Sequence, residues 1–429
     1  MGKIIIGTLI ILLVATAAGY TVLLNPSVQE SVGFQLNKWY VQINTILRPP
    51  QRVAFSSSSS SESVAESNEE QNELQDETKV ETSEEIENEE PEFAPIPQTF
   101  TIEGGTYYDQ HFRWNYCGPS SLGTLLSYWN VERDRDEVAH AMRTNTKDKN
   151  INPYEMVDYV KEETGLDALM RVGGDLEVLK RLISAGYPVI VEKGPEFLDI
   201  HNKITWMGHY QVMTGYNDLE EYFIAQDPYV EPDFEQSYGV LIDEWRSFNY
   251  TYIVVYPPTE EQDVLELLGE DADKSQNYLN ALEKAQQEFY QTTGVEQFFS
   301  IYNYGTNLVY LQDYAGAAKA YDTAFELYDA LPEDLSTKPY RILWYQTGPF
   351  YAYYYTGRYQ DVIDKATKNS IEMVRDDIPA LEESWYWLGA AKISIGETEE
   401  GIEDLLTCLE YQRFYPPCIQ ALNEQGIYP

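Results

Sequence analysis

A serine- and glutamate-rich stretch divides this chain, because it cannot join a hydrophobic core. Six consecutive serines, Ser56–Ser61, lead into a segment from Ser61 to Glu92 in which 14 of 32 residues are acidic and Lys79 is the only base. Such a segment has too little apolar surface to offset chain entropy, and its like charges repel one another. We therefore expect residues 51–97 to form a disordered linker that acts as an extended tether.

The chain before this linker is strongly apolar. Lys3 precedes Ile4–Leu24, an uncharged run of 21 residues that is long enough to cross a bilayer as a helix. We expect residues 1–25 to be a single-pass transmembrane anchor, followed by a juxtamembrane helix over residues 26–50. A cleaved signal peptide is the competing interpretation, since Ala15–Ala17 resembles a small-residue cleavage site. The very short tail before the span favours an extracytoplasmic position at the cell membrane for everything that follows.

Charge and composition exclude some classes of binding partner. The net charge of -42, from 71 acidic and 29 basic residues, argues against nucleic acid, which is bound by clustered Lys and Arg. With three cysteines and four histidines, no zinc-ligand spacing occurs, so we expect no metal and no cofactor. A length of 429 residues is too great for one core and predicts two domains with extensions.

The region 98–258 has the pattern of an α+β domain, with helices first and strands later. The strands are short, rich in Val, Ile and aromatic residues, and joined by connections too short for crossovers, which predicts antiparallel pairing. We expect helices over Arg135–Arg143, Pro153–Glu163 and Leu176–Ala185, and strands over Pro188–Val191, His209–Gly215, Tyr222–Asp227 and Tyr250–Tyr256.

Cys117 opens an apolar helix in the segment Gln110–Trp129. Pro119 suits the first turn of a helix, and leucines recur after it at helical spacing. Unpaired backbone amides and the helix dipole stabilise a thiolate at this position, and the same amides can hold a developing oxyanion. The alternative is that Cys117 is a small, buried apolar residue.

Two further residues complete a candidate site. His209 stands at the start of one predicted strand and Asp227 at the end of the next, so one hairpin brings them together. A cysteine peptidase needs a thiolate, an imidazole that exchanges its proton, and a polar group that fixes the imidazole tautomer. Cys117, His209 and Asp227 meet these needs, and Gln110 can supply an oxyanion donor.

These motifs resemble the papain-like C-39 peptidase family, whose founding members cut double-glycine leader peptides from bacteriocins. The resemblance covers about residues 98–257 and implies Cys117 as nucleophile, His209 as base, Asp227 as orienting group and Gln110 as oxyanion donor. It rests on Gln110, the run Cys117–Ser121, Gly208–Tyr210, Thr214–Tyr216 and Asp227-Pro228.

An insert, Gly194–Met207, precedes the histidine and has no clear counterpart in that family. Its Phe197 and Trp206 are open to two interpretations, cleft walls or packing residues. The other histidines, His111, His140 and His201, have no assigned role.

The region 265–429 is predicted to be helical and resembles tetratricopeptide repeats, in which small residues let antiparallel helices approach closely. The pattern runs from Tyr304 to Pro332 and returns from Trp385 to Leu405. Such stacks present a groove to a peptide or protein partner, although a packing scaffold for the first domain is an alternative. Cys408 and Cys418 could form a disulfide or stay as free thiols.

The sequence therefore predicts a membrane-anchored extracytoplasmic cysteine peptidase, with a peptide or protein as substrate and helical repeats that recognise a substrate or partner. The alternative is a non-catalytic cell-surface adaptor in which the papain-like domain is a pseudoenzyme.

Overall fold

A computed structural model of the chain describes residues 93, 95–111, 113, 115–143, 150–198, 204–334, 337–371 and 381–429. The predicted anchor (1–25), the juxtamembrane helix (26–50) and nearly all of the predicted linker (51–97) lie outside these residues, as does His201. Within the described ranges, no helix has both the length and the apolar character needed to cross a membrane.

The first described part of the chain is built on one antiparallel sheet. Seven strands of the described residues form it, six in the order β2-β9-β3-β6-β7-β8, with β1 paired to β6 outside that order. Consecutive strands β6 and β7 form a hairpin, so the start of β6 and the end of β7 lie at the same edge of the sheet. The strands are β1 Thr99–Thr101, β2 Asp167–Arg171, β3 Val189–Lys193, β6 His209–Asn217, β7 Tyr222–Asp227, β8 Glu231–Ser237 and β9 Tyr252–Tyr256.

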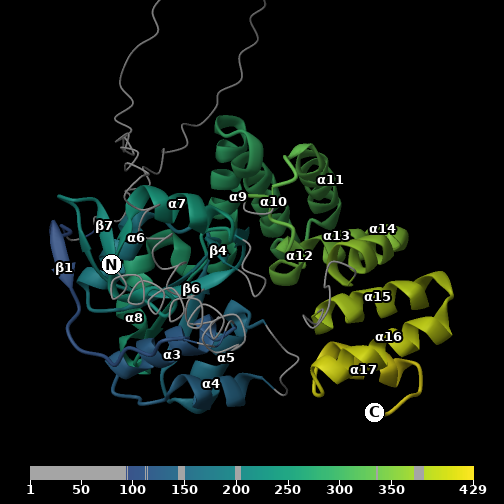
Figure 1. The fold of residues 1–429 in the computed structure, drawn as a ribbon, viewed down its shortest axis with the longest axis horizontal. Helices are drawn as coiled ribbons and strands as arrows, with labels where there is room; N and C mark the ends of the chain where they lie inside the picture. Colours follow the sequence, from purple (N-terminus) through teal and green to yellow (C-terminus); the bar gives the residue numbers. More distant parts are fainter. Residues whose placement is uncertain are drawn as a thin grey trace, which may run out of the picture.

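Helices cover both faces of this sheet because its strands bury side chains on both sides. Val189 and Val191 of β3 join one apolar cluster, and Ile190 between them joins another on the opposite face. Figure 1 shows α3, α4 and α5 on one side of the sheet and α6 and α7 on the other. The helices are α3 Cys117–Tyr128, α4 Arg135–Met142, α5 Pro153–Glu163, α6 Leu176–Ser184, α7 Tyr238–Arg246 and α8 Glu261–Leu268.

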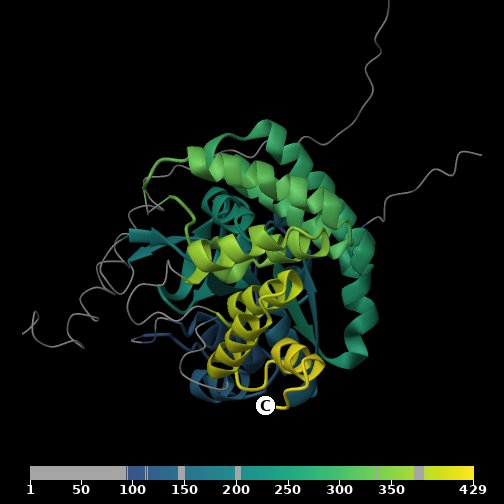
Figure 2. The same cartoon turned by 90° about the vertical axis from the view of Figure 1, so that its right-hand side faces the viewer.

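The C-terminal part is helical, and its helices follow one another in a stack coloured from green to yellow in Figure 2. Glycines allow close approach between paired helices. A Cβ on Gly389 of α15 would lie 2.6 Å from the Gly401 carbonyl oxygen of α16, so any side chain would force the two helices apart. The helices are α9 Lys274–Gln291, α10 Gly294–Tyr310, α11 Tyr314–Ala330, α12 Ile342–Tyr345, α13 Gly348–Tyr355, α14 Tyr359–Asp364, the π-helical Lys365–Ile371, α15 Glu382–Ile395, α16 Thr398–Tyr411 and α17 Pro416–Glu424.

The two parts share an apolar core. The insert forms a separate hairpin of β4 (Glu196–Leu198) and β5 (Ile204–Trp206). Trp206 is 3% exposed and stacks on Phe248, with ring centroids 5.6 Å apart. Its ring also lies 5.7 Å from that of Phe299 on α10, and both belong to the main cluster of the helical region. The sheet domain and the helices are therefore packed together rather than merely linked.

Buried polar contacts reinforce this interface. The Asn249 side chain donates to the Asn307 side-chain oxygen of α10 at 2.7 Å. Asn277 of α9 accepts from the Val172 backbone amide at 3.0 Å and donates to its carbonyl at 2.8 Å. Buried amide groups that bond each other in pairs fix the orientation of the two parts.

Cys408 and Cys418 form a disulfide, with their Cα atoms 6.6 Å apart. This bond joins α16 to α17 at the C-terminal end of the stack. Cys117 is therefore the one free cysteine of the chain.

Most of the predicted elements are confirmed, including α4, α5, α6 and the β6–β7 hairpin. Six were missed: β1, β2, β4, β5, β8 and α7. The strand β8 contains Glu231, Pro232, Asp233 and Glu235, which are unfavourable in strands, and only its Phe234 and Gln236 are buried. Pairing with β7 at the edge of the sheet decides its structure.

Candidate active site

Cys117 is the first residue of α3, and its side chain is half-buried. No side chain caps this helix at Tyr116, so the backbone amides of the first turn are not satisfied by a cap. Such amides, together with the helix dipole, favour a negative charge on the cysteine sulfur. Both the position and the exposure suit a nucleophile.

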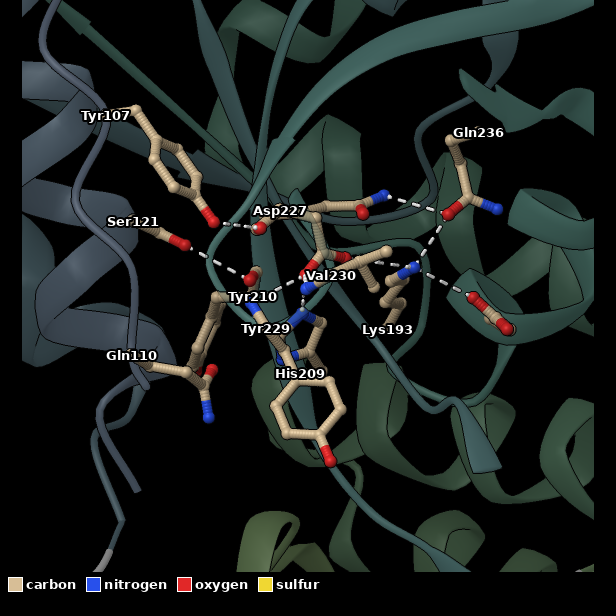
Figure 3. A network of polar contacts seen from close by, with 12 residues as sticks. Tyr107, Gln110, Ser121, Lys193, His209, Tyr210, Asp227, Tyr229, Val230 and Gln236 are labelled. Carbon is tan, nitrogen blue, oxygen red and sulfur yellow. Dashed lines mark hydrogen bonds and ion pairs between the residues drawn. The ribbon is translucent and has the colours of Figure 1, made fainter. Parts of the chain in front are cut away.

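His209 and Asp227 meet at the edge of the sheet, as the hairpin predicted. The imidazole Nε2 lies 2.9 Å from Asp227 Oδ1, and both residues are buried (Figure 3). The Cys117 side chain lies close enough to His209 to raise the pKa of its imidazole. Because Asp227 occupies Nε2, Nδ1 is the nitrogen left to face the sulfur. The structure thus brings together three residues that are far apart in the sequence.

The charges of this group stabilise one another. Burial by itself would lower the pKa of His209, but the Asp227 carboxylate and the Cys117 side chain raise that pKa from 6.5 to about 9. Burial would raise the pKa of Asp227, but His209, followed by Lys193 and the Val230 amide, lowers it to about 2. Between these values the pair is an imidazolium and a carboxylate.

The carboxylate of Asp227 is held in place by the backbone after β7. Its Oδ1 accepts from the Tyr229 amide at 2.9 Å and from the Val230 amide at 3.0 Å (Figure 3). The Tyr107 hydroxyl donates to the Asp227 backbone carbonyl at 2.8 Å. These contacts fix the aspartate so that it can orient the imidazole.

Aromatic side chains cover the histidine. Phe197 from the insert meets the His209 ring edge-on, with centroids 5.0 Å apart and planes at 81°, and it stacks on Tyr229 at 4.5 Å. Phe197 is 3% exposed. An apolar cover of this kind excludes water from the His209–Asp227 hydrogen bond and strengthens it. Of the two interpretations of Phe197, the structure supports packing, here directly on a candidate site residue.

Gln110 lies on the segment leading to α3 and is 4% exposed. Its backbone amide donates to the Pro228 carbonyl at 2.8 Å, which ties it to the residue after Asp227. Its side-chain nitrogen lies 3.4 Å from the Arg113 carbonyl. Gln110 therefore belongs to the same neighbourhood, whereas its role as an oxyanion donor stays a prediction.

The remaining described histidines contact other groups. His111 Nδ1 is 3.6 Å from the Asp109 carboxylate, and Nδ1 of the exposed His140 on α4 is 2.6 Å from the Asp136 carbonyl. No cluster of three or more His, Cys, Asp or Glu residues suited to a metal ion occurs in the described part of the chain.

Two nearby residues were missed by sequence reasoning. Lys193 ends β3 and lies 3.8 Å from Asp227 Oδ2. The ring of Tyr345 on α12 lies against Gly208, next to His209, and Tyr345 interacts electrostatically with Cys117. A lysine at the end of a buried strand was a readable signal for Lys193. Nothing in the sequence pointed to Tyr345, because it approaches the site only through the packing of the helical region.

These features define the class of domain. It is an α+β domain in which a cysteine at a helix N-terminus lies near a histidine and an aspartate on adjacent strands, and a helical region follows it. Residues 92–254 match the Peptidase_C39 like family. Among solved structures, one similar chain is a C39-like peptidase from Bacillus anthracis, 14% identical, with a TM-score of 0.31 and coverage of 37% of this chain and 98% of that one. No curated protein matches the chain.

Proposed function

We propose that the protein is a cysteine peptidase in which Cys117, His209 and Asp227 act as nucleophile, acid–base and orienting group. The observation that carries the proposal is the Asp227–His209 hydrogen bond of 2.9 Å, on an imidazole close enough to the Cys117 side chain for the cysteine to raise its pKa. A structural cysteine gains nothing from a buried imidazole whose pKa an aspartate raises. The match of residues 92–254 to a peptidase family supports the same chemistry.

The reaction follows from these positions. The Cys117 thiolate attacks the carbonyl carbon of a peptide bond, and the oxyanion is held by amides at the start of α3 and, in this proposal, by Gln110. The His209 imidazolium gives its proton to the leaving amine. Neutral His209 then takes a proton from water, which hydrolyses the thioester and regenerates the thiolate.

Mapping of reactive thiols tests the proposal. Brief treatment with iodoacetamide without reductant is expected to label Cys117 and to leave the disulfide-bonded Cys408 and Cys418 unlabelled. Labelling of Cys117 should slow strongly in His209→Ala, because the imidazolium that stabilises the thiolate is lost. Peptide mass spectrometry reads both results. Equal labelling rates in the two proteins would contradict the assignment.

The pH dependence of turnover is a second test. Since the pKa of His209 is raised to about 9, the imidazolium persists below that pH and is lost above it, so kcat/KM is expected to fall on the alkaline side near pH 9. In Asp227→Asn the main cause of the raised pKa disappears, and the alkaline limb should move down by about one to two pH units.

Asp218→Asn is the matched control for this shift. Asp218 is also carried by the β6–β7 hairpin but pairs with Lys180, 3.3 Å away, instead of with His209. Its alkaline limb should stay in place. If Asp227→Asn and Asp218→Asn give the same profile as the parent protein, Asp227 does not orient His209.

We also propose that residues 1–25 anchor the enzyme in the cell membrane, with residues 51–97 as a tether and the folded part on the extracytoplasmic side. The Cys408–Cys418 disulfide supports this location, since disulfides persist in oxidising compartments. Protease treatment of intact cells tests it: the folded part should be degraded or released while the cytoplasm stays protected. Protection of the folded part would overturn the proposed topology.

For the helical region we propose tetratricopeptide-like repeats that bind part of a protein substrate or a partner. The small residues at the α15–α16 contact and the stacked helix pairs support this kinship.

A further inference from the structure

A lysine lies buried beside the candidate site. Lys193 is the last residue of β3 and is paired with His209 across the β3–β6 ladder. It is 2% exposed, although the free energy of burying an ammonium group is high unless its charge is compensated. Figure 3 shows its side chain pointing toward Asp227 and Gln236.

Three groups compensate this charge. Lys193 Nζ lies 2.7 Å from Gln236 Oε1, 3.0 Å from Glu244 Oε2 and 3.8 Å from Asp227 Oδ2. They come from β8, α7 and β7, so three different elements converge on one ammonium group. Gln236 Oε1 is also 3.5 Å from the Gln211 side-chain nitrogen, which keeps this amide oxygen turned toward the lysine.

The two carboxylate oxygens of Asp227 differ in their hydrogen-bond partners. Oδ1 accepts three hydrogen bonds, from His209, Tyr229 and Val230. Oδ2 is buried and has no hydrogen-bond donor among the described residues, so the Lys193 ammonium at 3.8 Å is the charge that balances it. When one oxygen of a buried carboxylate is fully hydrogen-bonded and the other has no donor, rotation of the group or uptake of a proton lowers its free energy. A cation that faces the second oxygen removes this tendency.

We propose that Lys193 is a positioning residue for the peptidase reaction: it holds Asp227 ionised and directs Oδ1 at His209, while Glu244 and Gln236 hold Lys193. The inference rests on the proposed function, because it acts through the Asp227–His209 pair. The charged and titratable groups around it are Asp227, Glu244, His209 and, through His209, Cys117; the Tyr107 hydroxyl faces the backbone of Asp227.

Loss of the lysine should therefore change the acid side of the pH profile of kcat/KM. Lys193 lowers the pKa of Asp227, so its removal lets the carboxylate take up a proton at a higher pH. The protonated acid no longer supports the imidazolium, and the Cys117 thiolate loses its partner. The acid limb of kcat/KM is expected to rise by about one pH unit from its position near the Asp227 pKa of about 2, so kcat/KM below the limb falls about tenfold while its value at pH 5 stays unchanged.

The experiment compares Lys193→Met with the double variant Lys193→Met/Glu244→Gln, which also removes the carboxylate that the single change deprives of its lysine partner. The matched control is Lys180→Met. Lys180 is 5% exposed and also pairs with two carboxylates, 2.5 Å from Glu177 and 3.3 Å from Asp218, but these do not belong to the site. Two profiles are measured for each folded protein, kcat/KM for a fluorogenic peptide and the rate of Cys117 alkylation by iodoacetamide, from about pH 2 to about pH 10.

The expected result is an upward shift of the acid limb in both Lys193 variants and none in Lys180→Met. An unshifted acid limb in the folded double variant, or the same shift in Lys180→Met, would overturn the inference. The variant Asp227→Asn distinguishes failure of the inference about Lys193 from failure of the proposed function. If Asp227→Asn leaves the alkylation profile unchanged, the triad is wrong; if it changes the profile and the Lys193 variants do not, only the role of Lys193 is wrong.

Discussion

Cys117→Ala is expected to abolish peptide hydrolysis, with kcat falling by at least about 10⁴-fold. The covalent route needs a sulfur at this position, and the half-buried Cys117 is the one free cysteine of the chain. His209 and Asp227 cannot replace it, because they are buried and bonded to each other at 2.9 Å. Hydrolysis of a peptide library by the purified protein, read by mass spectrometry, measures the fall in activity.

Folding must be shown to survive this change. Because an alanine at the start of α3 removes little buried surface, the melting temperature is expected to change by no more than a few degrees. Cys408→Ser with Cys418→Ser is the control for the other two sulfurs, and this pair should keep its activity on short peptides. Full activity in Cys117→Ala would rule out the thiol mechanism and favour a binding role for the domain.

The second large effect concerns stability. Trp206→Ala is expected to lower the free energy of unfolding by about 3–5 kcal/mol, because it removes a buried indole from the core shared by the sheet domain and the helices. In the parent protein this indole packs against the rings of Phe248 and Phe299, and alanine is too short to reach either of them. Urea unfolding followed by circular dichroism and by fluorescence measures the change.

Tyr290→Ala supplies the matched comparison, since this aromatic residue of α9 is 76% exposed and should change the stability by less than about 0.5 kcal/mol. The parent protein should unfold in one transition, because the two parts share a core. Truncation after Pro258 would expose Trp206, Phe248 and Val172 and should give an insoluble product. Two separate transitions in the parent protein, with Trp206→Ala affecting only one, would show that the parts are independent.

The local elements of the sheet domain were predictable where each carried its own signal. Pro153 at a helix start and the turn between His209 and Asp227 are local features, so α5 and the β6–β7 hairpin were found. The mostly exposed and polar sequence of β8 carries no such signal. This segment is a strand only because it pairs with β7. Pairing of this kind depends on residues distant in the sequence, which a local pattern does not contain.

The candidate site divides in the same way. Cys117, His209 and Asp227 could be proposed from the sequence because each stands at the end of a predictable element. Lys193 and the packing of Phe197 on His209 were not assigned, since both depend on how the insert and α7 fold back on the sheet. The sequence left open whether the insert forms a cleft wall or packs, and its two large aromatic residues are both buried.

The insert hairpin connects the candidate site physically to the core of the helical region. One of its strands places Phe197 against His209, and the other places Trp206 in the core of the helical region, three residues before that histidine. Close-packed side chains cannot be displaced singly. A ligand that shifts α10 or α12 thus changes the position of Trp206 and, through this short connection, that of the imidazole. Such coupling is reciprocal, so a peptide held at Cys117 must alter the affinity of the helices for that ligand by the same factor.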